Sequence, residues 1–323
     1  MTAPLLQVDN LSVSLPTPAG PLNAVRHVSF AVNAGETLCI VGESGCGKSM
    51  TSLALMDLLP KGAKRTVDAL RFDGVDLASI GKSGMNDLRG NAMAMIFQEP
   101  MTALNPAYTI GDQLTEHYIL HRGAGAADAR QRALFLLDKV GIAAAERRLG
   151  QYPHQLSGGL RQRVMIAMAL MCGPKLLIAD EPTTALDVTI QAQILRLLLD
   201  LQQEFGIALL FITHDLGVVA RIATRVAVMY AGEIIEQANA RDLFARPRHP
   251  YTAGLMDCIP VPGKTVPGGH LGAIPGVVPS LVGDLAGCMF RDRCPYAEEA
   301  CRTAPPAHQA GDHIWRCIRA EQP

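Results

Sequence analysis

The chain has 323 residues, of which 49% are hydrophobic and 18% charged, and its formal net charge is −1 at pH 7. This length allows a large core and about two domains, while the near-neutral charge excludes a strong pull toward nucleic acid or an anionic membrane surface. Asp, Gly, Pro or Lys interrupts every apolar stretch before the ~18 residues that a membrane span needs, so we expect a soluble protein. Residues 1–10 lack the pattern of a secretory signal, which favours a cytoplasmic location.

The first chemically informative segment is a strand, a glycine-rich loop and a helix. Residues 36–41 have the short apolar pattern of a buried strand, and residues 50–59 are compatible with a helix that Pro60 ends. Between them lies a match to G-x-x-x-x-G-K-[ST], made of Gly42, Glu43, Ser44, Gly45, Cys46, Gly47, Lys48 and Ser49. Glycines let backbone N–H groups approach triphosphate oxygens closely. Lys48 would reach the β and γ phosphates and the Ser49 hydroxyl would bind Mg²⁺, unless the match is only a glycine-rich turn.

The next predicted elements are an apolar strand before Gln98 and a helical region after it. Residues 129–140 have the apolar spacing of a helix. Residues 156–163 then read Leu-Ser-Gly-Gly-Leu-Arg-Gln-Arg, and a helix-prone stretch follows at 164–171. Small residues at the predicted start of that helix offer a hydroxyl and backbone amides to a phosphate group; they are Ser157, Gly158 and Gly159.

A second apolar run, residues 176–181, ends in Asp180 and Glu181. A buried strand would deliver these carboxylates to its C-terminal edge. There Asp180 would hold Mg²⁺ and Glu181 would act as general base on the attacking water. Taken alone, such a run can equally mark a strand that reaches solvent.

In this order the motifs resemble those of ATP-binding cassette (ABC) ATPases. Residues 156–163 are similar to the family signature, residues 176–181 to Walker B, and Gln98, Asp187 in Ala185-Leu186-Asp187, and His214 to the Q-loop, D-loop and switch residues. The resemblance implies a RecA-like α/β P-loop domain with an antiparallel β portion and a helical subdomain. It also implies that Gln98 contacts Mg²⁺ and the attacking water, that His214 holds the γ-phosphate, and that the signature and Asp187 contact ATP.

The family closes ATP between two head-to-tail cassettes, so the resemblance implies a dimer, with an identical or different second ATPase subunit. One feature departs from the family pattern. The aromatic residue that stacks on adenine near the N-terminus is missing from residues 8–15, and Leu15 or Val25 would supply apolar contact instead.

From residue 246 the sequence changes character, with a Pro/Gly-rich run at 259–279 that indicates a docked linker. Residues 249–252 (His-Pro-Tyr-Thr) and 274–279 resemble the tail of dipeptide/oligopeptide importer ATPases, as do residues 43–49 and 97–106. His249 is expected to pack in a turn. We expect an ATP-binding core at 1–97 and 157–245, a helical subdomain at 98–156 with the signature at its end, and a C-terminal extension at 246–323.

The extension carries four cysteines in the spacing C-x5-C-x6-C-x15-C: Cys288, Cys294, Cys301 and Cys317. Four thiolates can hold a [4Fe-4S] cluster or Zn²⁺, and clustered cysteines in a reducing cytosol favour a metal over disulfides. Structural zinc sites more often use cysteines two to four residues apart, and such pairs are missing here. The family's tail has a similar pattern that some members use for an iron–sulfur cluster. We expect a [4Fe-4S] cluster, with zinc or no metal as alternatives.

The resemblance implies that ATP hydrolysis by this chain powers import of dipeptides or oligopeptides through a membrane ABC transporter. It further implies two transmembrane permease subunits, an indirect link to a solute-binding protein, and a peripheral position on the cytoplasmic face of the inner membrane. The same subfamily also imports nickel, glutathione, opines or sugars, and these remain alternatives. A non-transport ABC ATPase with an iron–sulfur domain is a further alternative. A nucleic-acid partner is not expected, because heptads and a basic stripe are missing.

Overall fold

The computed structural model describes residues 3–98, 103–184, 186–259, 272–283 and 285–319. Ala185 of the predicted D-loop, residues 99–102 after Gln98, and residues 260–271 of the Pro/Gly-rich run lie outside this part. The chain forms two compact units. Unit 1 consists of Met1–Leu5, Val32–Glu36 and Asp73–Phe211, and unit 2 of Leu6–Ala31, Thr37–Phe72 and Ile212–Pro323.

Unit 1 combines a pair of parallel strands with most of the helices. Its elements are β6 (Val75–Asp76), α2 (Gly81–Leu88), β7 (Met93–Ile96), α4 (Ile110–Arg122), α5 (Ala126–Lys139), α6 (Ala145–Leu149), η1 (Pro153–Gln155), α7 (Gly158–Ala169), β8 (Leu176–Asp180), α8 (Val188–Phe205) and most of β9 (Ala208–Thr213). β7 pairs in parallel with β8, with Met93 opposite Leu176. Every residue of β8 is buried, as both faces of a parallel strand require.

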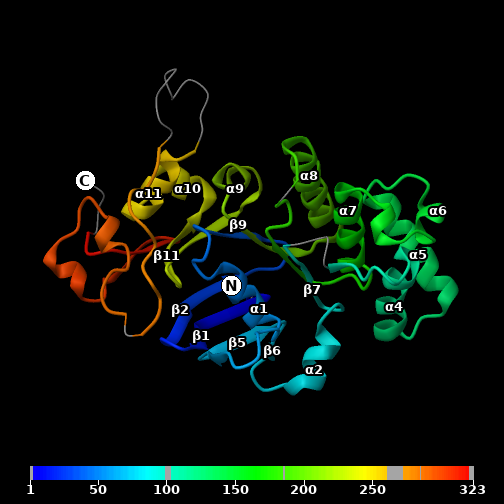
Figure 1. Ribbon diagram of the computed structural model, residues 1–323, viewed down its shortest axis with the longest axis horizontal. Helices are drawn as coiled ribbons and strands as arrows, with labels where there is room; N and C mark the ends of the chain where they lie inside the picture. The colour runs from blue at the N-terminus through cyan, green and yellow to red at the C-terminus, as the bar shows by residue number, and fades with distance from the viewer. Residues whose placement is uncertain (1–2, 99–102, 185, 260–271, 284, 320–323) are drawn as a thin grey trace. The chain divides into compact units, whose positions relative to one another are not determined.

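The helices α4, α5, α6 and α7 pack on one another within unit 1 and form the green and cyan group in Figure 1. α5 buries Ala129, Ala133, Leu136 and Leu137, whose spacing places them on one face. α4 begins with a capping box between Thr109 and Asp112, which satisfies backbone donors that the helix leaves open. The predicted helix at 129–140 is confirmed, although it begins three residues earlier and ends at Lys139.

Unit 2 contains two sheets. Its elements are β1 (Leu6–Thr17), β2 (Gly20–Val32, whose last residue belongs to unit 1), β3 (Thr37–Val41), α1 (Lys48–Leu55), β4 (Lys64–Thr66), β5 (Ala69–Phe72), the end of β9, α9 (Leu216–Ile222), β10 (Arg225–Tyr230), β11 (Glu233–Asn239), α10 (Ala240–Ala245), α11 (Pro250–Asp257), η2 (Arg291–Arg293), η3 (Glu299–Arg302), β12 (Ala307–Ala310) and β13 (His313–Arg316). β1 lies between β2 and β5 and also pairs antiparallel with β4. The other sheet has the order β12-β13-β11-β10-β3 within this unit. Its β10 runs parallel to β3 and antiparallel to β11.

The C-terminal extension therefore contributes strands to a sheet of unit 2. Trp315 of β13 lies opposite Glu236 of β11, and β12 pairs with the outer side of β13. Figure 1 draws α11 of this extension in yellow and the part after residue 271 in orange and red. Among the helices of the described chain, none is long and apolar enough to cross a membrane.

Candidate functional site

The glycine-rich loop of residues 42–47 connects β3 to α1 in unit 2, as the sequence predicts. β3 is buried along its whole length. α1 begins at Lys48, two residues before the predicted start, and ends at Leu55 rather than at residue 59. The earlier end has a local cause, because Asp57 adopts a left-handed backbone conformation with φ 51°.

Two glycines of this loop leave no room for a side chain. A Cβ on Gly42 would lie 2.1 Å from the carbonyl oxygen of Met229, and one on Gly47 would lie 2.3 Å from that of Ala24. Gly47 also has φ 105°, a conformation that L side chains rarely adopt. The loop conformation therefore depends on glycine at these two positions.

The Lys48 side chain folds back over the loop and is 4% exposed. Its Nζ donates hydrogen bonds to the carbonyl oxygens of Gly42 at 2.8 Å and Glu43 at 3.0 Å. Burial raises the pKa of the neighbouring Cys46 thiol although Lys48 lies beside it, so Cys46 packs as a small neutral side chain. Ser44, Gly45 and Ser49 complete the predicted phosphate-binding residues of this loop.

In unit 1, Gln98 and Glu181 lie together. Gln98 Nε2 donates to Glu181 Oε2 at 3.2 Å, and Thr184 Oγ1 donates to the same oxygen at 2.9 Å. Asp180 is the last residue of β8 and is 4% exposed. Glu181 already lies outside the strand and has φ 45°, a left-handed conformation that is uncommon for glutamate. The two acids therefore differ in burial and in backbone geometry.

The signature and D-loop residues lie at helix N-termini of unit 1. Ser157 is the N-cap of α7 and its hydroxyl accepts a hydrogen bond from Leu160 N at 3.4 Å, with Gly158 and Gly159 as the first helical residues. Asp187 caps α8 by accepting from Ile190 N at 2.9 Å. In unit 2, His214 is exposed and follows β9 directly. Val25 is 1% exposed and Leu15 half-buried, so Leu15 is the more accessible of the two apolar candidates for contact with adenine.

The four cysteines of the extension line one small cavity together with His249 and Phe290. Cys301 and Cys317 are buried, whereas Cys288 and Cys294 are half-buried. Burial raises the pKa of Cys288 to about 11 and also raises the pKa values of Cys294 and Cys317. Across the described residues, however, no group of three or more His, Cys, Asp or Glu side chains is arranged to hold a metal ion. The metal site expected at these cysteines is therefore not supported by their arrangement.

Comparison with known proteins agrees with the motif order. The family model "ABC transporter" matches residues 25–184, and the model "Oligopeptide/dipeptide transporter, C-terminal region" matches residues 235–301. The dipeptide transport ATP-binding protein DppD of Escherichia coli is 50% identical over 94% of this chain and 92% of its own length. The chain belongs to the ABC transporter ATP-binding family. The oligopeptide transport ATP-binding protein AppD of Bacillus subtilis is 49% identical, over 98% of this chain and 97% of its own length.

Solved ABC structures confirm the predicted fold class of this ABC ATPase. The dimeric post-hydrolysis structure of the ATP-binding cassette MJ0796, bound to ADP and Pi, superposes with a TM-score of 0.65 at 28% identity and covers 73% of this chain and 99% of that one. The cbiO1 structure from Clostridium perfringens gives a TM-score of 0.64 at 27% identity, with coverage of 76% and 92%. The RecA-like α/β cassette and its ATPase activity are thus supported by both sequence and fold.

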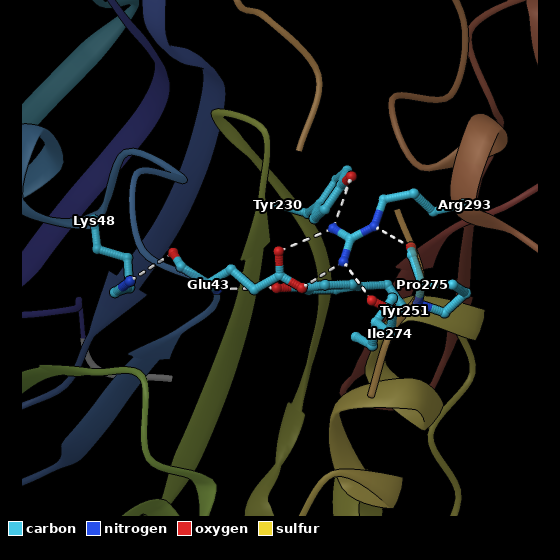
Figure 2. A network of polar contacts seen from close by, with 7 residues as sticks. All are labelled: Glu43, Lys48, Tyr230, Tyr251, Ile274, Pro275 and Arg293. Carbon is cyan, nitrogen blue, oxygen red and sulfur yellow. Dashed lines mark hydrogen bonds and ion pairs between the residues drawn. The ribbon is translucent and has the colours of Figure 1, made fainter. Parts of the chain in front are cut away.

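Sequence reasoning missed a set of residues that surround Glu43 in unit 2. Arg293 of the extension forms an ion pair with Glu43, and Tyr230 and Tyr251 lie in the same polar network (Figure 2). Glu43 and Arg293 are 250 positions apart. No spacing signal links residues at this separation, so the pair became visible only in the folded chain.

Proposed function

We propose that this ABC ATPase powers the import of dipeptides or oligopeptides through a membrane transporter. The observation that carries this proposal is the match of residues 235–301 to the C-terminal region of oligopeptide/dipeptide transporters, in addition to the ATPase match. The relatives DppD and AppD, which are named for dipeptide and oligopeptide transport, align with nearly the whole chain. Import of nickel, glutathione, opines or sugars is less favoured by these names.

Each proposed site residue has a chemical task in ATP hydrolysis. Lys48 binds the β and γ phosphates, and backbone amides of the glycine-rich loop contact phosphate oxygens. Ser49, Asp180 and Gln98 offer a hydroxyl, a buried carboxylate and an amide oxygen, which are the hard oxygen ligands that suit Mg²⁺. When bound, Mg²⁺ neutralises charge on the phosphate oxygens. Glu181 accepts a proton from the attacking water, and its contacts with Gln98 and Thr184 orient its carboxylate. His214 contacts the γ-phosphate.

We also propose that two cassettes act as a dimer, in which the signature of one chain completes the nucleotide site of the other. The helix N-terminus at Ser157, Gly158 and Gly159, with Asp187 nearby in sequence, would face the partner's ATP. The dimeric MJ0796 cassette supports this arrangement as a structural neighbour. The proposed division into an ATP-binding core (1–97 and 157–245), a helical subdomain (98–156) and an extension (246–323) follows from the same family pattern.

The helical part of unit 1 offers a docking groove for a permease subunit. The groove is lined by α4 and the residues before it, and its exposed apolar side chains include Tyr108, Ile119 and Leu120, at 56%, 40% and 75% exposure. We propose that a cytoplasmic helix of the permease binds here and that the ATPase sits on the inner face of the membrane. A solute-binding protein would then deliver substrate to the permeases.

We propose further that the cysteine-lined cavity holds a [4Fe-4S] cluster. Cys288, Cys294, Cys301 and Cys317 offer the four thiolates that such a cluster takes and line one cavity, although no three of their side chains in the described structure are arranged to hold a metal ion. The test is the iron and acid-labile sulfide content of protein purified without oxygen. Cys294→Ser should lose iron while nucleotide binding remains. Absence of iron and sulfide from the unmodified protein would refute the cluster.

The proposed ATPase site is tested by Glu181→Gln, which keeps the volume of the side chain but removes the base. We expect ATP binding to persist and turnover to fall by at least ~100-fold. Hydrolysis at the normal rate would refute the role of Glu181. The cargo is tested separately, by reconstituting the ATPase with its permeases and solute-binding protein. Dipeptides or oligopeptides should stimulate hydrolysis, and stimulation by nickel or sugars alone would overturn the peptide assignment.

A further inference from the structure

An acidic residue occupies the second position of the glycine-rich loop, where a polyanion is expected to bind. Glu43 follows Gly42 directly, and its carbonyl oxygen accepts a hydrogen bond from Lys48 Nζ. An unpaired carboxylate at this position would repel a triphosphate and compete for Lys48. The loop therefore needs a cation that neutralises Glu43.

Arg293 of the C-terminal extension supplies this cation. Its Nη1 donates to Glu43 Oε2 at 2.9 Å and its Nη2 donates to Glu43 Oε1 at 3.1 Å, so the pair is bidentate (Figure 2). The Arg293 side chain is 5% exposed and that of Glu43 is 26% exposed. Bidentate contacts between a guanidinium and a carboxylate fix orientation as well as charge.

The guanidinium is itself held by the extension and by β10. Arg293 Nε donates to Pro275 O at 2.8 Å, Nη2 donates to Ile274 O at 3.2 Å, and Nη1 donates to Tyr230 Oη at 3.3 Å. These contacts occupy the donors of Arg293 that face away from Glu43. Arg293 is thus a rigid part of the extension rather than a side chain that reaches across from the surface.

The backbone of Glu43 is fixed by a second residue from outside the loop. Glu43 N donates to Tyr251 Oη at 3.0 Å, and Tyr251 is completely buried. The Tyr251 ring packs against Tyr230 and Phe290, with ring centroids 4.5 Å and 5.4 Å away. The extension therefore contacts both the side chain of Glu43, through Arg293, and its backbone N–H, through Tyr251. The carbonyl oxygen of Glu43 in turn contacts Lys48.

We propose that Arg293 is a positioning residue for nucleotide binding, which neutralises Glu43 and holds the loop of residues 42–49 ready for the triphosphate. The proposal rests on the proposed role of this loop as the phosphate-binding site. It gives the extension a direct part in the ATPase, through a contact within unit 2. Loss of the guanidinium leaves an unpaired carboxylate on the phosphate-binding loop, whereas loss of both charges does not.

The test is a cycle of variants with MgADP as the probe, measured by equilibrium titration. Arg293→Met keeps an apolar side chain that can pack on Tyr230 and Phe290, and should weaken MgADP binding by ~10- to 100-fold. Glu43→Gln should bind within about three-fold of the unmodified protein, because Gln still accepts a hydrogen bond from Arg293. The double variant should recover most of the affinity that Arg293→Met loses.

This recovery separates positioning by charge from a merely structural role. If Arg293 only stabilised the fold, the double variant would bind no better than Arg293→Met, and that result would overturn the proposal. An affinity of Arg293→Met within two-fold of the unmodified protein would overturn it as well. The weakening should also shrink at high salt, because it arises from repulsion between anions.

Three further variants make the outcome unambiguous. Arg302→Met removes an arginine of the same extension whose side chain is 73% exposed, and it should leave MgADP affinity unchanged. Lys48→Ala tests the loop assignment on its own. If Lys48→Ala bound MgADP normally, the proposed phosphate site would fail, independently of the result for Arg293. If Arg293→Met does not fold, Arg293→Lys decides, because it keeps a cation beside Glu43. It should bind MgADP within about three-fold of the unmodified protein, and a ten-fold weaker affinity would refute neutralisation of Glu43 as the task of Arg293.

Discussion

Glu236 connects the C-terminal extension to the sheet of unit 2, and its substitution should loosen this connection. Glu236 lies in β11 and is 1% exposed. Its Oε1 accepts from Arg248 N at 2.6 Å and from His313 Nε2 at 2.7 Å, and its Oε2 accepts from His249 N at 2.8 Å. One carboxylate thus accepts hydrogen bonds both from the segment before α11 and from the start of β13.

The expected cost follows from the donors that each substitution leaves unpaired. In Glu236→Gln the amide oxygen can still accept from Arg248 N and His313. The NH₂ group, however, faces His249 N, so this buried donor loses its acceptor, at a cost in stability of about 1–3 kcal/mol. Glu236→Ala removes the acceptor of three donors, Arg248 N, His249 N and His313 Nε2, and each donor left unpaired costs about 1–3 kcal/mol. We therefore expect Ala to destabilise the region more than Gln does.

Amide hydrogen exchange measures this effect at the bonds concerned. The amide of residue 249 should exchange faster in both variants and that of residue 248 chiefly in Glu236→Ala, and the free energy of local opening should fall more in Glu236→Ala than in Glu236→Gln. Gln237→Ala is the matched control in the same strand, because the hydrogen bond from its side chain to Ser29 O is exposed and should contribute about 1 kcal/mol. The reasoning is refuted if Glu236→Gln leaves the exchange of both amides within about 0.5 kcal/mol of the unmodified protein.

Two further predictions concern the loop and the extension. Gly42→Ala should weaken MgADP binding by at least ~10-fold in a fluorescence titration, because its Cβ would collide with the Met229 backbone; normal affinity would contradict the geometry. Burial lowers the pKa of His249 from 6.5 to about 4. Between these pH values the unfolded chain binds more protons than the folded chain. The free energy of unfolding should therefore fall as the pH drops from about 6.5 to 4, by about 3 kcal/mol at most. His249→Asn keeps an acceptor for Tyr251 N but does not titrate, so this pH dependence should flatten in thermal unfolding, and an equal slope would disprove the role of His249.

Local patterns predicted the elements that carry the site. The strand before the glycine-rich loop, expected at 36–41, forms at Thr37–Val41, and the expected helix 164–171 falls in α7, apart from its last two residues. The expected packing role of His249 in a turn is also confirmed, because it is buried and caps α11. These features depend on residues close in sequence, which periodicity and capping rules describe.

Features that depend on distant residues were not predictable in this way. The left-handed backbone of Glu181 has no sequence signature, because glutamate rarely adopts it. β13 is short and half polar, and its pairing with β11 defines it as a strand rather than its own composition. The spacing of the four cysteines predicts a metal site, whereas the arrangement of their side chains gives it no support.

The pairing of β13 with β11 also covers part of the edge that β11 would otherwise expose. Without the extension, β11 would present open N–H and C=O groups at Glu236 and Gln237, a template on which a strand of another chain can add. The hairpin of β12 and β13 replaces that edge by a shorter one, whose residues at 307–310 are mostly exposed. A chain cut after α10 should therefore aggregate rather than yield a smaller working cassette.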